Sequence, residues 1–273
     1  MVAKLVKGIV ALEDTLVWRT DVRMSILQFS LPYDPLSPKP LLGISPLDPS
    51  EWLMVDEAYA GQVAEKQRVL AAHRSDVLMQ EPVADEAADE LLSEVTGHLL
   101  RDHKGFELDG QMMTCPDGRQ VDCSGSPLEV LGGLVQEDLC ILQKPEGQDE
   151  HIFTAGLLAF PASWRLKDKF MQPLTLIHVP VGEYDDVMAK RVQRLFDGIQ
   201  VGRPLWRFNA LWYQAPDLHQ PRAMDERRPH VGPNGPYMRS ERQTLLRLPL
   251  TGAVVFGIHT FVVRRSSLGL AEQ

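Results

Sequence analysis

The sequence predicts an α+β domain, with an antiparallel β-sheet flanked by helices. Two helix-like stretches, at about residues 52–73 and 83–100, precede most of the strand-like stretches. Helices and strands that are segregated along the chain, instead of alternating regularly, are typical of this class. The strongest strand signal lies at 241–264 and predicts a hairpin with its turn at 249–252.

The first fifty residues are expected to form an irregular wrap around the domain. Six prolines between Pro32 and Pro49 exclude a long helix in that stretch. The acidic turn at 48–51 is typical of a helix start, and acidic residues at the beginning of 83–100 suit the positive end of a second helix dipole. We expect these two helices to pack as an antiparallel pair.

The remaining elements are short. In chain order they are a small hairpin at 115–118, a helix at 128–135, strands at 139–142 and 151–160, a helix at 185–199, a strand at 205–213 and a long loop at 215–237. In the second strand of the 241–264 hairpin, both faces are largely apolar. Such a strand is expected to lie in the centre of a sheet, covered on both sides.

The composition excludes several classes of partner. The chain has 273 residues and a formal net charge of −9, so we expect neither nucleic acid nor a membrane as a partner. Its three cysteines do not predict a disulfide framework and fit a reducing, cytoplasmic location. No stretch approaches the ~20 apolar residues of a transmembrane helix, and the N-terminus lacks the pattern of a signal peptide.

His178 is the strongest single candidate for a metal ligand. It interrupts the apolar run 174–181, where a neutral imidazole can bind a metal or a haem iron; the alternative is a core histidine with a hydrogen-bonded partner. His259, on the apolar strand, is the second candidate. The remaining histidines are expected to face solvent: His73, His98, His103, His151, His219 and His230.

Four polar side chains are predicted to converge on two strands. Arg207 and Asn209 lie on one side of the strand at 205–213, and Glu241 and Gln243 share one side of the hairpin's first strand. If the strands pair, the carboxylate can bind a substrate ammonium, and the arginine can bind a cofactor propionate or a substrate anion. The alternative is a structural Arg–Glu pair at a sheet end.

Several ordered blocks between about 28 and 264 together resemble the haem-dependent oxidative N-demethylase family. The blocks are Ser163-Trp164-Arg165-Leu166 with Lys169, Ile177-His178-Val179-Pro180-Val181 with Tyr184, Arg207-Phe208-Asn209, and Glu241–Pro249 with Gly252–Phe256. Trp52, Asp56, Tyr59 and the segment 137–139 also resemble that family. The chain departs from the family pattern at Gly182, Leu205 and Ala210.

The resemblance implies a single domain over 1–273, with a PAS-like sheet core at about 135–264 that encloses haem b. It implies oxidative removal of a methyl group from a small secondary amine such as dimethylamine, with dioxygen and a flavin/iron–sulfur reductase as electron donor. His178 would then bind the iron, Arg207 and Glu241 would orient dioxygen and the amine, and Asn209 and Gln243 would support them around the cofactor.

Two alternatives keep the fold and change the function. One is a haem-binding PAS-like sensor or carrier without turnover, and the other is a structural subunit without haem. A Soret band separates the last from the others, and formaldehyde release from dimethylamine separates an enzyme from a sensor.

Overall fold

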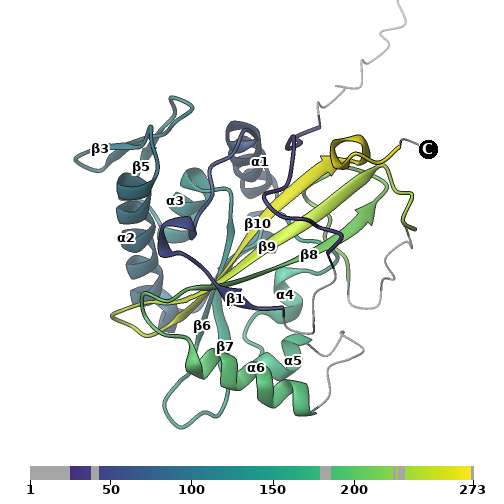
Figure 1. The fold of residues 1–273 in the computed structure, drawn as a ribbon. Helices are drawn as coiled ribbons and strands as arrows, with labels where there is room; N and C mark the ends of the chain where they lie inside the picture. The colour runs from purple at the N-terminus through teal and green to yellow at the C-terminus, as the bar shows by residue number, and fades with distance from the viewer. Residues whose placement is uncertain (1–24, 38–42, 179–185, 224–225, 227–230, 272–273) are drawn as a thin grey trace, which may run out of the picture.

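The computed structural model describes residues 25–37, 43–178, 186–223, 226 and 231–271. These residues form a seven-stranded antiparallel sheet with helices on both faces, and a separate three-stranded sheet at one end (Figure 1). The predicted α+β class is therefore confirmed. Within the described part of the chain, no helix is both long and apolar enough to cross a membrane.

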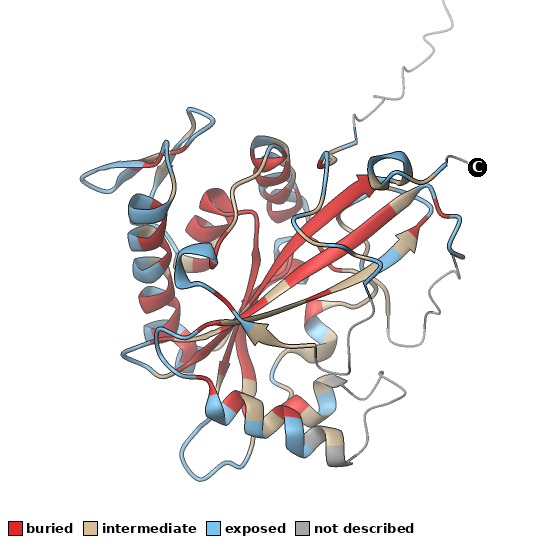
Figure 2. Cartoon of the chain, viewed as in Figure 1, coloured by how far each residue is buried: buried red, intermediate tan, exposed pale blue. Residues whose placement is uncertain are grey.

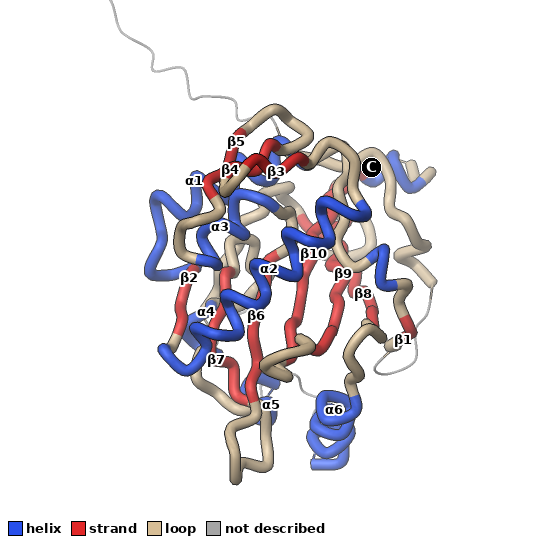
Figure 3. Tube along the Cα trace, turned by 90° about the vertical axis from the view of Figure 1, so that its left-hand side faces the viewer, coloured by secondary structure: helices blue, strands red, loops and turns tan. Residues whose placement is uncertain are grey.

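The strands of the large sheet lie in the order β1-β8-β9-β10-β6-β7-β2 (Figure 3). Their bounds are β1 Ser45–Pro46, β2 Leu78–Gln80, β6 Asp138–Gln143, β7 Ile152–Leu157, β8 Leu205–Tyr213, β9 Tyr237–Arg247 and β10 Val254–Arg264. The small sheet consists of β3 Glu107–Asp109, β4 Met112–Thr114 and β5 Gln120–Asp122. The turn at 115–118 joins β4 to β5, as the sequence predicts.

The six α-helices of the described residues are α1 Tyr59–Val77, α2 Asp85–Asp102, α3 Pro127–Leu134, α4 Leu166–Lys169, α5 Leu174–His178 and α6 Asp186–Gly198. Three 3-10 turns accompany them: η1 Pro49–Glu51, η2 Pro82–Ala84 and η3 Arg265–Leu268.

The first predicted helix begins later than expected. The Asp48 side chain caps η1 by accepting a hydrogen bond from the Ser50 N–H at 2.9 Å, and α1 itself begins only at Tyr59. The cap signal in the sequence is real, but it belongs to a single turn that ends before the long helix starts.

The predicted direct packing of the first two helices is wrong, because α3 lies between α1 and α2 (Figure 1). A Cβ atom at Gly132 of α3 would come within 2.9 Å of Leu70 on α1 and 2.8 Å of Leu157 on β7. The missing side chain therefore lets α3 lie close to both elements.

The hairpin prediction is confirmed in detail. β9 and β10 pair from Tyr237↔Arg264 to Arg247↔Val254, and β10 lies between β9 and β6 in the centre of the sheet. β9 begins four residues before the predicted strand, at Tyr237, so that it includes Arg239. Figure 2 shows that these central strands are mostly buried.

The sheet separates two hydrophobic clusters. One contains buried residues of α1, α2 and α3, and the other contains Leu166 of α4, Leu174 of α5 and Phe196 of α6. On β10, Val255 belongs to the first cluster, and Ile258 to the second, as alternation along a strand requires. We call the two sides of the sheet the α1–α3 face and the α4–α6 face.

The five longer strands of the sheet have a simple topology. In the order of the chain they are β6, β7, β8, β9 and β10, and across the sheet they run β8-β9-β10-β6-β7, so that the last strand pairs with the first. The PAS-like description of this core stays a prediction.

Candidate functional site

Strand register brings the four predicted polar residues together. In the antiparallel pair of β8 and β9, Arg207 lies opposite Gln243 and Asn209 lies opposite Glu241. Directly opposed residues in a sheet point to the same side, and in β9 this is the side of Leu245, which packs in the α4–α6 cluster. All four side chains therefore share the α4–α6 face.

The Glu241 carboxylate is held by two amides and one distant arginine. Its Oε2 accepts hydrogen bonds from Asn209 Nδ2 at 3.0 Å and from Gln243 Nε2 at 3.1 Å. Its Oε1 lies 3.9 Å from Arg239 Nη2, too far for a normal hydrogen bond. The amides therefore fix the orientation of the carboxylate and leave Oε1 able to accept a further donor.

Arg239 is a site residue that the sequence analysis missed, because the predicted strand began only at Glu241. Its guanidinium donates to the carbonyl oxygens of Phe160 at 2.6 Å and Leu218 at 2.8 Å. These bonds tie β9 to the segments that follow β7 and β8, and they place a positive charge beside Glu241.

Arg207 carries a partly buried charge without a hydrogen-bond partner in the described part of the chain. Its Nε is buried and unpaired. Burial lowers the pKa of Arg207, and the nearby Glu241 carboxylate offsets part of this effect. Burying a charge costs free energy unless a counter-charge or hydrogen bonds compensate it. For Arg207 this cost is only partly compensated.

Lys169 is a third cation near Glu241, after Arg239 and Arg207, and the sequence analysis gave it no role. It ends α4, and its Nζ lies 4.4 Å from the centre of the Trp164 ring. Burial lowers the pKa of Lys169, while the Cys140 thiol, Glu241 and Asp168 act in the opposite direction. Among the described residues it makes no hydrogen bond or ion pair; the carboxylate of Asp168 is held by Arg165 at 2.9 and 3.0 Å.

The sheet is incompletely covered next to these groups. Phe256 lies near the start of the central strand β10 and is only half-buried, although its neighbours along the strand are buried. Gln243, one strand away, is also half-buried, as are Arg207 and Asn209 on β8. The apolar floor and the polar groups thus form one accessible patch of the α4–α6 face.

His178 is the last residue of α5, and its side chain and residues 179–185 lie outside the described part of the structure. The residues before His178 show which side of this helix packs against the sheet. Leu174 and Ile177 pack in the same cluster as Leu245 and Ile258, whereas Leu176 is exposed. The run that looked uniformly buried in sequence is a short amphipathic helix that borders the α4–α6 face.

His259 belongs to the opposite face, where both of its ring nitrogens have a carboxylate partner. Its Nδ1 lies 3.1 Å from Glu137 Oε1, and its Nε2 lies 3.1 Å from Asp56 Oδ2. Burial lowers the pKa of His259, but Glu137 and Asp56 outweigh it and raise the pKa to about 9. A protonated imidazole between two carboxylates has no lone pair for iron, so the structure leaves His259 unsuited as the ligand.

A buried lysine extends the charge network on this face. Lys66 of α1 donates to the carbonyl oxygens of Gln136 at 2.9 Å and Val135 at 3.3 Å, and its Nζ lies 3.3 Å from Asp138 Oδ1. Asp138 also accepts hydrogen bonds from two backbone N–H groups, those of Ala159 and Phe160. Each buried charge here has an opposite charge and hydrogen bonds.

Two histidines that were expected to face solvent are buried, so this prediction is wrong for them. His98 packs against Trp52 with ring centroids 5.3 Å apart, and His151 lies beside Gln193 of α6. Burial lowers the pKa of His98 to about 4, so the ring is neutral at physiological pH. Their polar sequence neighbours gave no sign that tertiary packing covers them.

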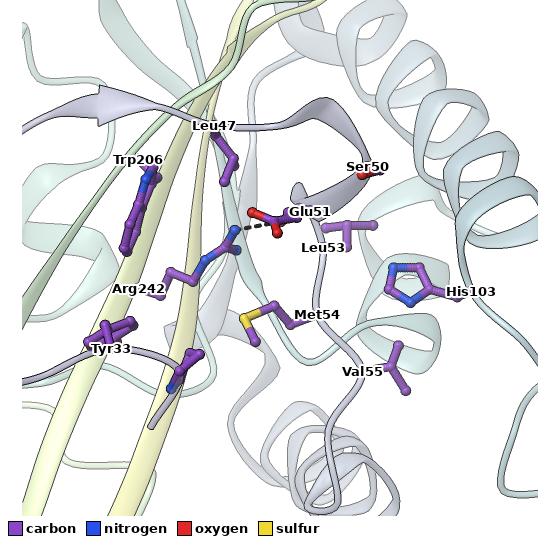
Figure 4. A pocket seen from close by; sticks show the side chains of 11 residues that line it. Tyr33, Leu47, Ser50, Glu51, Leu53, Met54, Val55, His103, Trp206 and Arg242 are labelled. Carbon is purple, nitrogen blue, oxygen red and sulfur yellow. Dashed lines mark hydrogen bonds between the residues drawn. The ribbon is translucent and has the colours of Figure 1, made fainter. Parts of the chain in front are cut away.

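A pocket of about 380 Å³ opens between the segment 47–55 and the α1–α3 face of β8 and β9 (Figure 4). Arg242 points into it and donates to the backbone oxygens of Glu51 and Trp52, while its guanidinium also lies 5.7 Å from the Trp206 ring. These contacts bind the N-terminal segment to the sheet, so this arginine is satisfied by the protein itself. It differs in this respect from Arg207 on the other face.

A comparison with family models adds independent evidence. The model described as haem-dependent oxidative N-demethylase, alpha subunit-like, matches residues 43–271. The match covers most of the chain and includes α4, α5 and the three strands β8, β9 and β10 that carry the polar groups. The chain therefore belongs to the haem-dependent oxidative N-demethylase, alpha subunit-like family.

Proposed function

We propose that this protein is a haem-dependent monooxygenase that removes a methyl group from a small secondary amine, such as dimethylamine. Such a reaction consumes one dioxygen, two electrons and two protons, and it releases the primary amine, formaldehyde and water. The electrons come from a flavin/iron–sulfur reductase, as the resemblance implies. The observation that carries the proposal is the Glu241 carboxylate, held by two amides on an incompletely covered apolar face.

The residues of this face suit a haem. The half-buried Phe256, packed beside the buried Ile258 and Leu245, offers an apolar surface to a macrocycle, and the unpaired Nε of Arg207 indicates a missing acceptor. His178 directly follows Ile177, which packs in that cluster, and would bind the iron. When bound, haem b supplies the activation of dioxygen; the protein supplies the axial ligand, the polarity of the pocket and the orientation of the amine.

Glu241 would hold the amine. A dialkylamine is protonated at neutral pH and therefore needs a counter-charge in a partly buried site. Asn209 and Gln243 keep Oε2 occupied, so the ammonium N–H would donate to Oε1. The amides also prevent the carboxylate from rotating, which would hold the methyl group in one direction relative to the haem.

Two variants test the proposed roles of His178 in binding the iron and of Glu241 in binding the amine. His178→Ala is expected to lower the haem content of the purified protein, measured as the pyridine haemochrome. Glu241→Gln is expected to keep the haem and to reduce amine turnover at low amine concentration roughly tenfold to a hundredfold, since a charge-assisted hydrogen bond contributes ~1.5–3 kcal/mol. Formaldehyde release with dimethylamine, dioxygen and a reductase is the measurement.

Glu107→Gln, an exposed glutamate of β3, is the matched control and should leave both haem content and turnover unchanged. A wild-type protein that binds haem but releases no formaldehyde from any small methylamine would favour the sensor or carrier. Full haem content in His178→Ala would reject the ligand assignment.

A further inference from the structure

Positive charge exceeds negative charge around Glu241. Arg239 lies 3.9 Å from its Oε1, and both Arg207 and Lys169 are close enough for the carboxylate to raise their pKa values against the effect of burial. Asp168, the other carboxylate near Lys169, forms a two-bond pair with Arg165. Three cations thus share the single carboxylate of Glu241, and two positive charges are left without a counter-charge among the described residues.

The two cations in excess are also the two that have no hydrogen-bond partner within the described ranges of the chain. Arg239 donates to the carbonyl oxygens of Phe160 and Leu218 and so has a structural role. Arg239 also has a buried, unpaired Nε, but Arg207, with its own unpaired Nε, donates no hydrogen bond at all to the described residues. Lys169 lies over the Trp164 ring and likewise makes no hydrogen bond or ion pair with them. A folded chain that leaves two partly buried cations unsatisfied is expected to bind an anion there.

We propose that Arg207 and Lys169 bind the two carboxylates of the haem. The inference rests on the proposed function, since it concerns the same cofactor, and it assigns a role to Lys169. A dicarboxylate supplies the two negative charges that the site lacks, and an arginine with a free edge can donate two parallel hydrogen bonds to one of them.

This role differs from the one that the resemblance implies for Arg207, the orientation of dioxygen. Dioxygen is neutral and supplies no counter-charge, so it would leave both cations uncompensated. A carboxylate compensates the charge and also accepts the hydrogen bond that Nε lacks.

The test uses haemin and haemin dimethyl ester, which present the same macrocycle with and without free carboxylates. Each is titrated into the purified full-length protein and followed by the Soret band. The wild type is expected to bind haemin at least tenfold more tightly than the ester. Arg207→Met and Lys169→Met are each expected to weaken haemin binding about tenfold, and the double variant about a hundredfold, with the affinity for the ester unchanged.

Lys167→Met is the matched control, because Lys167 is an exposed lysine on the same turn of α4 as Lys169. It should retain the wild-type preference for haemin. Unchanged binding of the ester shows that the variants are folded and that the pocket for the macrocycle is intact.

The outcomes separate this inference from the proposed function. A double variant that still prefers haemin over its ester, or that loses affinity for both equally, overturns the role of Arg207 and Lys169 and leaves haem binding standing. A wild type that binds neither porphyrin overturns the proposed function and this inference with it.

Discussion

The two faces of the large sheet differ in how far their buried charges are compensated by other protein groups. On the α1–α3 face, His259 lies between Glu137 and Asp56, and Lys66 lies beside Asp138. Each of these buried charges has an opposite charge and further hydrogen bonds, although Glu137 Oε2 is itself buried without a partner among the described residues. On the α4–α6 face, Arg207 and Lys169 are partly buried cations without hydrogen-bond partners in the described part of the chain.

The difference indicates which polar residues serve the fold and which serve a ligand. A closed network links α1, β6, β10 and the segment 54–58 and holds the layers together. Unsatisfied groups reduce the stability of the chain alone, and proteins retain them where a bound molecule completes them. The histidine most deeply buried in the sheet is therefore structural, although its apolar strand made it a ligand candidate.

Breaking the closed network should have the largest effect. Lys66→Met leaves Asp138 buried without its counter-charge, and it removes the donor of the hydrogen bonds to the oxygens of Val135 and Gln136. We expect the free energy of unfolding, measured with urea, to fall by ~3–5 kcal/mol. Arg68→Met, two residues further along α1, is the control, since Arg68 is exposed and pairs with Glu65. That change should lower the free energy of unfolding by less than ~1 kcal/mol. Equal losses in the two variants would contradict the claim that the buried network stabilises the fold more than the exposed pair does.

The network should also make the free energy of unfolding depend on pH between 6.5 and about 9, through His259. The pKa of His259 is raised from 6.5 to about 9, so between these values the folded state holds a proton that the unfolded state has lost. The stabilisation is fully present below pH 6.5 and disappears as the pH rises through about 9, with a total of the order of 3 kcal/mol. Urea unfolding at pH 6, 7.5 and 9 would measure it.

His259→Gln is the comparison for this window, because glutamine keeps hydrogen-bonding capacity without titrating. The variant should be less stable than the wild type at pH 6, and the difference should shrink as the pH rises toward 9. A difference that stays constant across these pH values would show that His259 is not protonated in the fold.

The sequence predicted the sheet well and the charge network poorly. The hairpin of β9 and β10, strand β8 and the convergence of Arg207, Asn209, Glu241 and Gln243 follow from alternation within strands and from local turn signals, which the sequence displays directly. The partners of His259 are Asp56 and Glu137, which lie 203 and 122 residues away along the chain. No local pattern shows such a contact.

Arg239 and Lys169 were missed for related reasons. Arg239 lies before the predicted start of its strand, and strand ends are the least certain part of such a prediction. Lys169 lies in a polar helical turn typical of a solvated surface, and only tertiary packing buries it beside Trp164 and Glu241. Lys169 comes from α4, far along the chain from the hairpin that suggested the site.

The smallest predicted effect belongs to the most direct test of the central claim, which is that a bound anion compensates the cations on the α4–α6 face. The measurement is the free energy of unfolding of the Arg207→Met and Lys169→Met double variant relative to the wild type, with and without haemin. Without haemin, removal of two unsatisfied cations should leave the stability unchanged or raise it by about 1 kcal/mol, since an unpaired buried charge is costly. With haemin in excess, the wild type should become the more stable protein, because it binds the ligand more tightly. A double variant that is clearly less stable than the wild type without haemin, or that gains as much stability from haemin as the wild type does, would contradict the account.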